Sequence, residues 1–205
     1  MQTKPLILAL LAGLSFSGTS QAALMDRGGG LIYDDVLNIT WLQDANYART
    51  SGYDADGLMY WYDAMTWADN LVYHDSLHNE DYSDWRLPSI NGELIHHFVS
   101  NLGNKAGESV LNQIGDTAEQ IANLELFSNV QSNVYWSGTN DVPGYAWVFY
   151  TNNGFDSIVG KDHLELLAWA VRSGDVAAEG NVPEPATLML LGLGLAGLGV
   201  MRRRG

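Results

Sequence analysis

The chain has 205 residues, of which 24 are acidic and ten are basic, so its formal net charge is −14 at neutral pH. That charge disfavours binding to nucleic acid or to anionic lipid. The sequence contains no cysteine, which excludes disulfide bonds, thiol chemistry and zinc–thiolate sites.

The first 22 residues are typical of a secretory signal peptide. Lys4 precedes the apolar stretch Leu6–Leu14, and the small-residue sequence Ser20-Gln21-Ala22 follows it. This pattern predicts cleavage after Ala22 or Ala23 and export through the inner membrane. A retained N-terminal anchor is the alternative, although the apolar stretch is short for a stable span.

Residues 23–176 are predicted to form one domain, followed by a linker over 177–182. The region 23–182 carries 23 acidic and six basic residues, a net charge of −17, and it holds all seven tryptophans. Its length is ordinary for a single domain and allows a core large enough to fold without disulfides.

The start of this domain predicts two strands and a helix. Short strands are expected over Leu31–Tyr33 and Val36–Leu42, on either side of an Asp34-Asp35 turn. Apolar residues at helical spacing predict an amphipathic helix over Gly57–Tyr73, with Asp56 as its N-cap.

The middle of the domain predicts further helix. A second helix is expected to begin after Ser89, to run to Leu102 and to end at Gly103. The stretch Glu108–Phe127 is expected to be helical in pieces, with a break at Gly115-Asp116.

The last third of the domain changes to a strand pattern. Thr151-Asn152-Asn153-Gly154 is typical of a hairpin turn between two of these strands. Helices followed by a meander of antiparallel strands indicate an α+β fold. The expected strands are Val134–Ser137, Tyr145–Tyr150, Phe155–Val159 and Leu166–Arg172.

The C-terminal segment has three parts, which are Pro183-Glu184-Pro185, the uncharged apolar run Ala186–Met201 and the arginines Arg202, Arg203 and Arg204. As a helix the run would be about 24 Å long, short for a bilayer core of about 30 Å, and the arginines would stay on the cytoplasmic side. These physical features predict a weak membrane anchor.

In order and spacing, this segment resembles a PEP-CTERM sorting signal of Gram-negative exported proteins. The resemblance implies transient insertion into the inner membrane, recognition by an exosortase, and cleavage near Pro183-Glu184-Pro185. It also implies transfer to the cell surface or the extracellular matrix. A plain tail anchor is the alternative.

Several motifs follow one another along the domain, namely Asp26–Asp34, Ile39–Asp44, Tyr82–Ser89 with Glu93-Leu94, Tyr135–Thr139, Ala146-Trp147 and Ala170–Arg172. In sequence and order they resemble the Lcl C-terminal domain family, which is named for a collagen-like bacterial adhesin. The resemblance covers most of residues 26–174 and implies a C-type lectin-like α+β fold. Many relatives carry cysteines that this chain lacks, and the segment 102–133 is longer than expected.

The family motif Trp85-Arg86-Leu87-Pro88 offers a tryptophan for sugar stacking and an arginine for a carboxylate. A structural role is favoured, because Pro88 holds Leu87 extended at the entry to a helix. Arg86 is then expected to bind backbone carbonyls or a neighbouring carboxylate in the core. Arg172 is interpreted in the same way, and Trp136 and Trp147 are treated as structural motif residues.

Calcium is the one cofactor that the sequence suggests. Asp54-Ala55-Asp56-Gly57 resembles half of a calcium loop, and Asp44 lies upstream as a third ligand. The alternative is a helix cap within a solvated loop. The residue code of calcium-dependent lectins is absent, so the fold resemblance does not extend to that kind of sugar binding.

Other catalytic or metal patterns are weak. His74 and His78 are four residues apart and His96-His97 are adjacent, but the glutamate of a metalloprotease helix is missing. No phosphate loop or nucleophile elbow occurs in the sequence.

These observations favour a non-enzymatic, exported module for adhesion or for association with extracellular polysaccharide in a biofilm. The first alternative is an extracellular hydrolase that uses two carboxylates. The second is a purely structural matrix protein.

Overall fold

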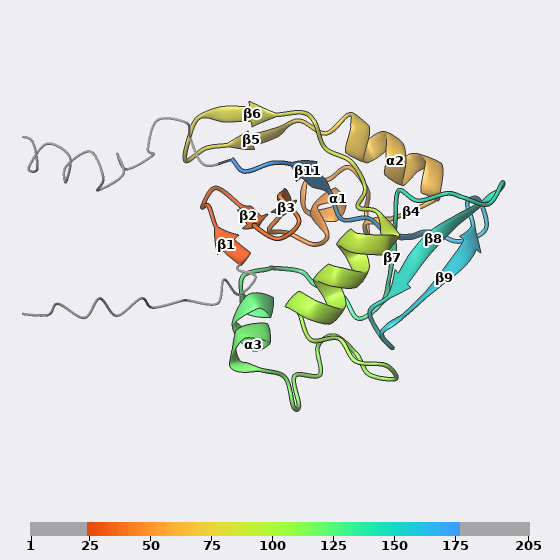
Figure 1. Cartoon of the computed structure of the whole chain (residues 1–205). Helices are drawn as coiled ribbons and strands as arrows, with labels where there is room; N and C mark the ends of the chain where they lie inside the picture. Colours follow the sequence, from red (N-terminus) through yellow and green to blue (C-terminus); the bar gives the residue numbers. More distant parts are fainter. Residues whose placement is uncertain (1–23, 177–205) are drawn as a thin grey trace, which may run out of the picture.

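Three β-sheets and a few short helices make up the part of the chain that the structure, a computed structural model, describes: residues 24–176 (Figure 1). They form one mixed α+β domain. The strands are β1 Leu24–Asp26, β2 Leu31–Asp34, β3 Ile39–Leu42, β4 Leu58–Met59, β5 Tyr73–Asp75, β6 Glu80–Tyr82, β7 Val134–Trp136, β8 Tyr145–Tyr150, β9 Phe155–Gly160, β10 Leu166–Leu167 and β11 Val171–Ser173. The helices are α1 Tyr47–Thr50, α2 Trp61–Asp69, η1 Ile90–Leu94, η2 His96–Asn101 and α3 Ala118–Glu125.

The four-stranded sheet joins the two ends of the described chain, with the antiparallel order β1-β2-β3-β11. The expected β2–β3 pair is confirmed, but β3 begins at Ile39 rather than at Val36. The reason is the buried carboxylate of Asp34, which accepts hydrogen bonds from the N–H groups of Val36 and Leu37 at 3.1 and 3.0 Å. These bonds hold the residues before Ile39 in a turn.

The five-stranded sheet has the order β4-β10-β7-β8-β9, and its β10–β7 pair is parallel. Strand β8 and the hairpin turn into β9 are confirmed, with the Gly154 N–H bonded to the Tyr150 carbonyl at 2.8 Å. The prediction of a single strand over Leu166–Arg172 is wrong. That stretch divides into β10 and β11, which belong to different sheets, and the indole of Trp169 between them donates to the Leu42 carbonyl at 2.7 Å.

Helix α2 is shorter than the predicted Gly57–Tyr73. Leu58 and Met59 pair with β10 as strand β4 and are therefore extended. The N-cap is consequently Tyr60 and not Asp56. The Asp56 carboxylate instead accepts a hydrogen bond from the Leu58 N–H at 3.0 Å, in the turn before β4.

The second predicted helix is present as η1 and η2, which are wound more widely than an α-helix. The N–H groups of Leu94 and Leu102 bond to carbonyls five residues back, those of Ser89 and His97. The helix ends where predicted, because Gly103 has a left-handed φ of 74° that continues no helix.

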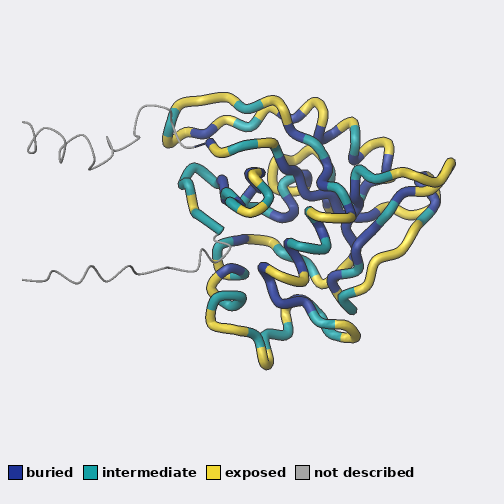
Figure 2. The backbone as a smooth tube through the Cα atoms, viewed as in Figure 1, coloured by how far each residue is buried: buried dark blue, intermediate teal, exposed yellow. Residues whose placement is uncertain are grey.

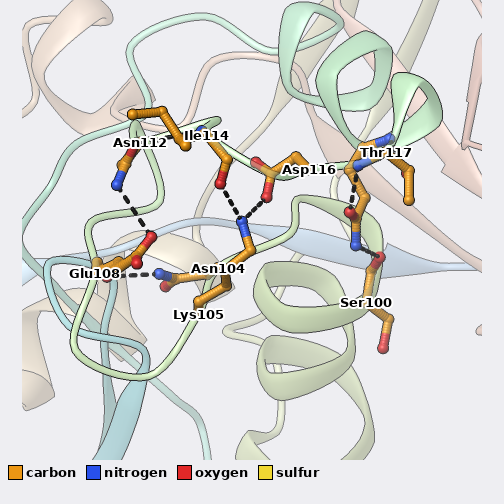
Figure 3. Close-up of polar contacts among 9 residues, drawn as sticks. Ser100, Asn104, Lys105, Glu108, Asn112, Ile114, Asp116 and Thr117 are labelled. Atoms are coloured by element: carbon orange, nitrogen blue, oxygen red, sulfur yellow. Dashed lines mark hydrogen bonds and ion pairs between the residues drawn. The ribbon is translucent and has the colours of Figure 1, made fainter.

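Within the segment 103–127 only α3 is helical. The prediction of helix over Glu108–Phe127 is therefore wrong for the residues that precede Thr117. Thr117 starts α3 with a reciprocal capping box to Gln120. Ahead of it, the Lys105 ammonium bonds to the Ile114 carbonyl at 2.9 Å and to the Asp116 carboxylate (Figure 3). The Lys105 side chain therefore supports this loop in addition to its backbone hydrogen bonds.

The same loop is held against the β8–β9 turn. The N–H of Gly107 donates to the Asn153 carbonyl, and that of Val110 to the Thr151 carbonyl, both at 2.7 Å. Within the loop, Glu108 accepts hydrogen bonds from the side chains of Asn104 and Asn112 (Figure 3).

Aromatic side chains fill the core that the sheets and η2 enclose. Figure 2 shows that the buried residues gather in this part of the domain. Phe98 of η2 stacks on Phe149 of β8 with ring centroids 5.1 Å apart, and Trp41 meets Trp169 edge-on at 5.3 Å. His97 of η2 also stacks on Trp41 of β3 with ring centroids 4.0 Å apart, so η2 packs against both sheets. The largest fully buried side chains include Trp41, Trp136, Trp169, Tyr135, Phe98 and Phe149.

Strand β1, helix α1 and the β5–β6 hairpin were not predicted from the sequence. No helix within residues 24–176 has the length and apolar character needed to cross a membrane. The predicted signal peptide, linker and 186–201 membrane segment lie outside the described residues.

Candidate functional site

The motif Trp85-Arg86-Leu87-Pro88 lies against the core rather than on an open face. Trp85 is only 3% exposed, and its indole donates to the Tyr82 carbonyl at 2.9 Å. The Arg86 guanidinium donates two hydrogen bonds to Glu93, at 2.8 and 2.6 Å, and a longer one to the Leu87 carbonyl at 3.3 Å. These contacts bury the Trp85 ring and engage the Arg86 guanidinium with Glu93.

The Glu93 carboxylate also accepts a hydrogen bond from the Ser89 N–H at 2.6 Å. Burial alone would raise the pKa of Glu93, but the hydrogen bonds from Arg86 and Ser89 outweigh it, so that the pKa is lowered. Hydrogen bonding to Glu93 raises the pKa of Arg86. The pair stays charged and clamps the motif to the start of η1.

The other motif residues lie in similar surroundings. Arg172 pairs with Asp84 at 2.7 Å and lies over the ring of Tyr82, 4.4 Å from its centroid. Trp136 is fully buried and donates to the Met59 carbonyl at 2.8 Å. Trp147 of β8 is partly buried against the core.

The three candidate calcium ligands do not converge. No group of three metal-ligating side chains occurs among residues 24–176. Asp54 accepts hydrogen bonds from the N–H groups of Asp56 and Gly57 at 3.0 and 2.8 Å, and it closes its own turn. Burial would raise the pKa of Asp54, yet these bonds lower it. The structure therefore supports turn capping by Asp54 and Asp56.

Three of the histidines, His74, His78 and His97, make structural contacts. His74 on β5 bonds to Asp81 on β6 at 2.7 Å, and His78 bonds to the buried Asp75 at 2.6 Å. His97 is fully buried and stacks on Trp41 with ring centroids 4.0 Å apart. No zinc site is formed in this region.

A groove beside α1 is the candidate binding site. It consists of two adjoining cavities of about 220 and 180 Å³ that share Thr50. The first is lined by Gly30, Leu42, Gln43, Asp44, Tyr47, Thr50, Tyr73 and Ser128, and the second by Asn46, Arg49, Thr50, Asn129 and Gln131.

The two cavities are joined by a hydrogen bond between side chains 85 residues apart. The Asn129 amide donates to the Asp44 carboxylate at 3.0 Å and lies 3.5 Å from the Thr50 hydroxyl. Asn129 has a left-handed φ of 56°, a conformation that asparagine adopts more readily than most other non-glycine residues. The backbone beside it is fixed, because Ser128 exchanges hydrogen bonds with Gln43 and Ala45 at 2.9 Å each.

Two tyrosines form the aromatic wall of the groove. Tyr47 and Tyr73 meet edge-on with ring centroids 5.2 Å apart. Tyr73 donates its hydroxyl to the Gly29 carbonyl at 2.8 Å. Burial, assisted by the charge of Asp44, raises the pKa of Tyr47, so its hydroxyl stays protonated as a donor. The left-handed Gly30 is required here, because a side chain would overlap the Tyr73 hydroxyl.

The groove combines ring faces, amides, a hydroxyl, a carboxylate and an exposed arginine, Arg49. Such a set can hydrogen-bond the hydroxyls of a sugar in both directions and stack on its apolar face. The sequence identified only Asp44 of this site, and for a different ligand. Asn129, Thr50 and Tyr47 carry no local pattern that would have marked them.

Comparison with known families agrees with the two resemblances seen in the sequence. Residues 30–172 match the Lcl C-terminal domain, and the chain therefore belongs to that family. Residues 181–204 match the PEP-CTERM protein-sorting motif. This motif implies that the protein is exported, sorted to the cell surface and processed by an exosortase. No curated protein matches the chain.

Proposed function

We propose that this protein is a non-enzymatic surface module that binds extracellular polysaccharide, in adhesion or in association with a biofilm matrix. Its fold is then the C-type lectin-like fold that the family resemblance implies. The observation that carries the proposal is the groove beside α1, in which Asp44, Thr50, Tyr47 and Tyr73 line one cavity, and Thr50 and Asn129 line the adjoining one. The sorting motif supports a location where such a ligand is present.

The groove favours a neutral glycan. The region 23–182 carries a net charge of −17, and one of its acidic residues, Asp44, lies inside the site. Hydrogen bonds to sugar hydroxyls and stacking on tyrosine faces depend little on ionic strength. Binding is therefore expected to persist in salt and in the presence of a chelator.

Two carboxylates of the domain, Asp75 and Glu93, do not fit the part of the general acid in a hydrolase. A glycoside hydrolase needs a general acid whose pKa is raised, next to a second carboxylate. Hydrogen bonds overcome burial and lower the pKa of both Asp75 and Glu93. Steady release of reducing ends from a bound glycan would replace the binding proposal with the hydrolase alternative.

The proposal is tested on a glycan array with the exported, processed protein. The Asp44→Asn variant removes the charge but keeps an acceptor, and it is expected to weaken binding about 10- to 100-fold, because a hydrogen bond to a charged group contributes about 1.5–3 kcal/mol. Asp54→Asn makes the same chemical change outside the groove and should bind like the wild type.

If the wild type retains no glycan on the array, the result would support the alternative that the protein is purely structural in the matrix. Equal losses in both variants would mean that overall charge, and not the groove, governs binding.

A further inference from the structure

Lys161 is a buried cation without a carboxylate partner among residues 24–176. The residue is 7% exposed, and its ammonium lies 4.1 Å from the ring centroid of Trp61 and 5.6 Å from that of Tyr62. By contrast, the four cations Arg27, Arg86, Lys105 and Arg172 each pair with a carboxylate. An ammonium that lies over ring faces and pairs with no carboxylate in this part of the chain is left with capacity for an anion.

Backbone hydrogen bonds place Lys161 beside the first turn of α2. The Lys161 carbonyl accepts the Trp61 N–H, and the Lys161 N–H donates to the Gly144 carbonyl, both at 3.0 Å. In Figure 1 the start of α2 accordingly lies beside the end of β9. The indole of Trp61 is itself locked by a 2.8 Å hydrogen bond to the Ser137 carbonyl.

The first turn of α2 adds hydrogen-bond donors. Its N-cap, Tyr60, makes no side-chain cap, and the N–H groups of Tyr62 and Asp63 have no acceptor within residues 24–176. Free N–H groups at a helix start, together with the helix dipole, favour a negative group. The unpaired Lys161 ammonium is an independent observation that points to the same kind of ligand.

Exposed aromatic rings surround this turn. Tyr60, Tyr62 and Tyr145 are 39%, 58% and 42% exposed, and Tyr145 follows the glycine that bonds to Lys161. Ring faces of this kind stack on the apolar face of a sugar. The exposed carboxylates of Asp63 and Asp162 flank the site and disfavour a ligand that carries more than one charge.

We propose that Lys161 and the first turn of α2 form a binding site for a single sugar carboxylate, as found in a uronic acid. The carboxylate pairs with the Lys161 ammonium and accepts hydrogen bonds from the N–H groups of Tyr62 and Asp63. The sugar ring lies on the exposed tyrosines. This site uses none of the residues of the groove beside α1 and does not depend on the function proposed for that groove.

The test is an NMR titration of the exported protein with methyl glucuronide and with methyl glucoside, which differ in the carboxylate. The glucuronide is expected to shift the amide signals of Tyr62 and Asp63, to bind at least tenfold more tightly than the glucoside, and to lose that preference in high salt. Lys161→Met keeps the apolar stem and should abolish the preference. Arg27→Met removes a cation from the turn between β1 and β2 and should leave the preference unchanged.

Equal binding of the two glycosides, or a preference that survives in Lys161→Met, would overturn the proposal. Tighter binding of an acetylated glutamate peptide than of the glucuronide would overturn the assignment to a sugar. If Lys161→Met does not fold, the proposal is tested on the wild type alone. The amide signals of Tyr62 and Asp63 must then shift with the glucuronide and not with the glucoside. Asp44→Asn should keep the uronide preference even if the groove proves to bind nothing, so the two proposals fail separately.

Discussion

Arg86 and Glu93 form a two-pronged ion pair that closes the family motif onto the start of η1, with donor–acceptor distances of 2.8 and 2.6 Å. Glu93→Gln keeps the shape but removes the charge that the guanidinium and the Ser89 N–H both contact. We expect a loss of about 1.5–3 kcal/mol in the free energy of unfolding, the range for hydrogen bonds to charged groups. Urea denaturation measures it, and an unchanged midpoint would contradict the clamp.

Replacement of Trp85 by alanine is expected to cost about 3–5 kcal/mol, because a large buried aromatic side chain is lost and a cavity remains. Ile114, which is 83% exposed, provides the control, and Ile114→Ala should change stability by less than about 0.5 kcal/mol. A loss below about 1 kcal/mol for Trp85→Ala would mean that the tryptophan is available to a ligand.

Acid should destabilise the protein through His97. Burial, assisted by the charge of His96, lowers the pKa of His97 from its ordinary 6.5 to about 3. The unfolded chain therefore takes up this proton first, and the stability that is complete above pH 6.5 is lost at up to about 1.4 kcal/mol per pH unit as the pH falls toward 3.

Chemical denaturation between pH 6.5 and 5 tests this dependence, because the lowered carboxylate pKa values act only at lower pH. His97→Phe should flatten the dependence relative to the wild type. His163→Gln, at a side chain that is 70% exposed, should not. Parallel curves for wild type and His97→Phe would show that His97 does not titrate as described.

Both terminal segments are expected to be absent from the mature protein. The intact mass of protein recovered from exosortase-competent cells should correspond to a chain that begins near Ala23 and lacks the arginines Arg202–Arg204. Recovery of surface protein with those arginines still attached would contradict exosortase processing.

Local patterns predicted the elements that local forces determine. The hairpin between β8 and β9 follows from its turn residues, and the end of η2 follows from Gly103. An apolar run such as Leu166–Arg172 looks the same whether it forms one buried strand or crosses between two sheets, so its division was not predictable. The wide winding of η1 and η2 also left no sequence pattern.

The candidate site was less predictable than the fold. Asp44 stood out only as one acidic residue among many, and its partner Asn129 lies 85 positions further along the chain. What brings them together is the pairing of Ser128 with the segment after β3, a tertiary contact without a local signature.

The central claim is that the groove beside α1 binds a neutral glycan, and amide mapping by NMR tests it most directly. The exported protein is titrated with the neutral glycan that the array retains best. The account predicts that the largest shifts fall on Asp44, Thr50 and Asn129, that they persist with chelator and salt, and that Asp44→Asn weakens them. Shifts centred elsewhere in the domain, with the groove signals unmoved, would contradict it.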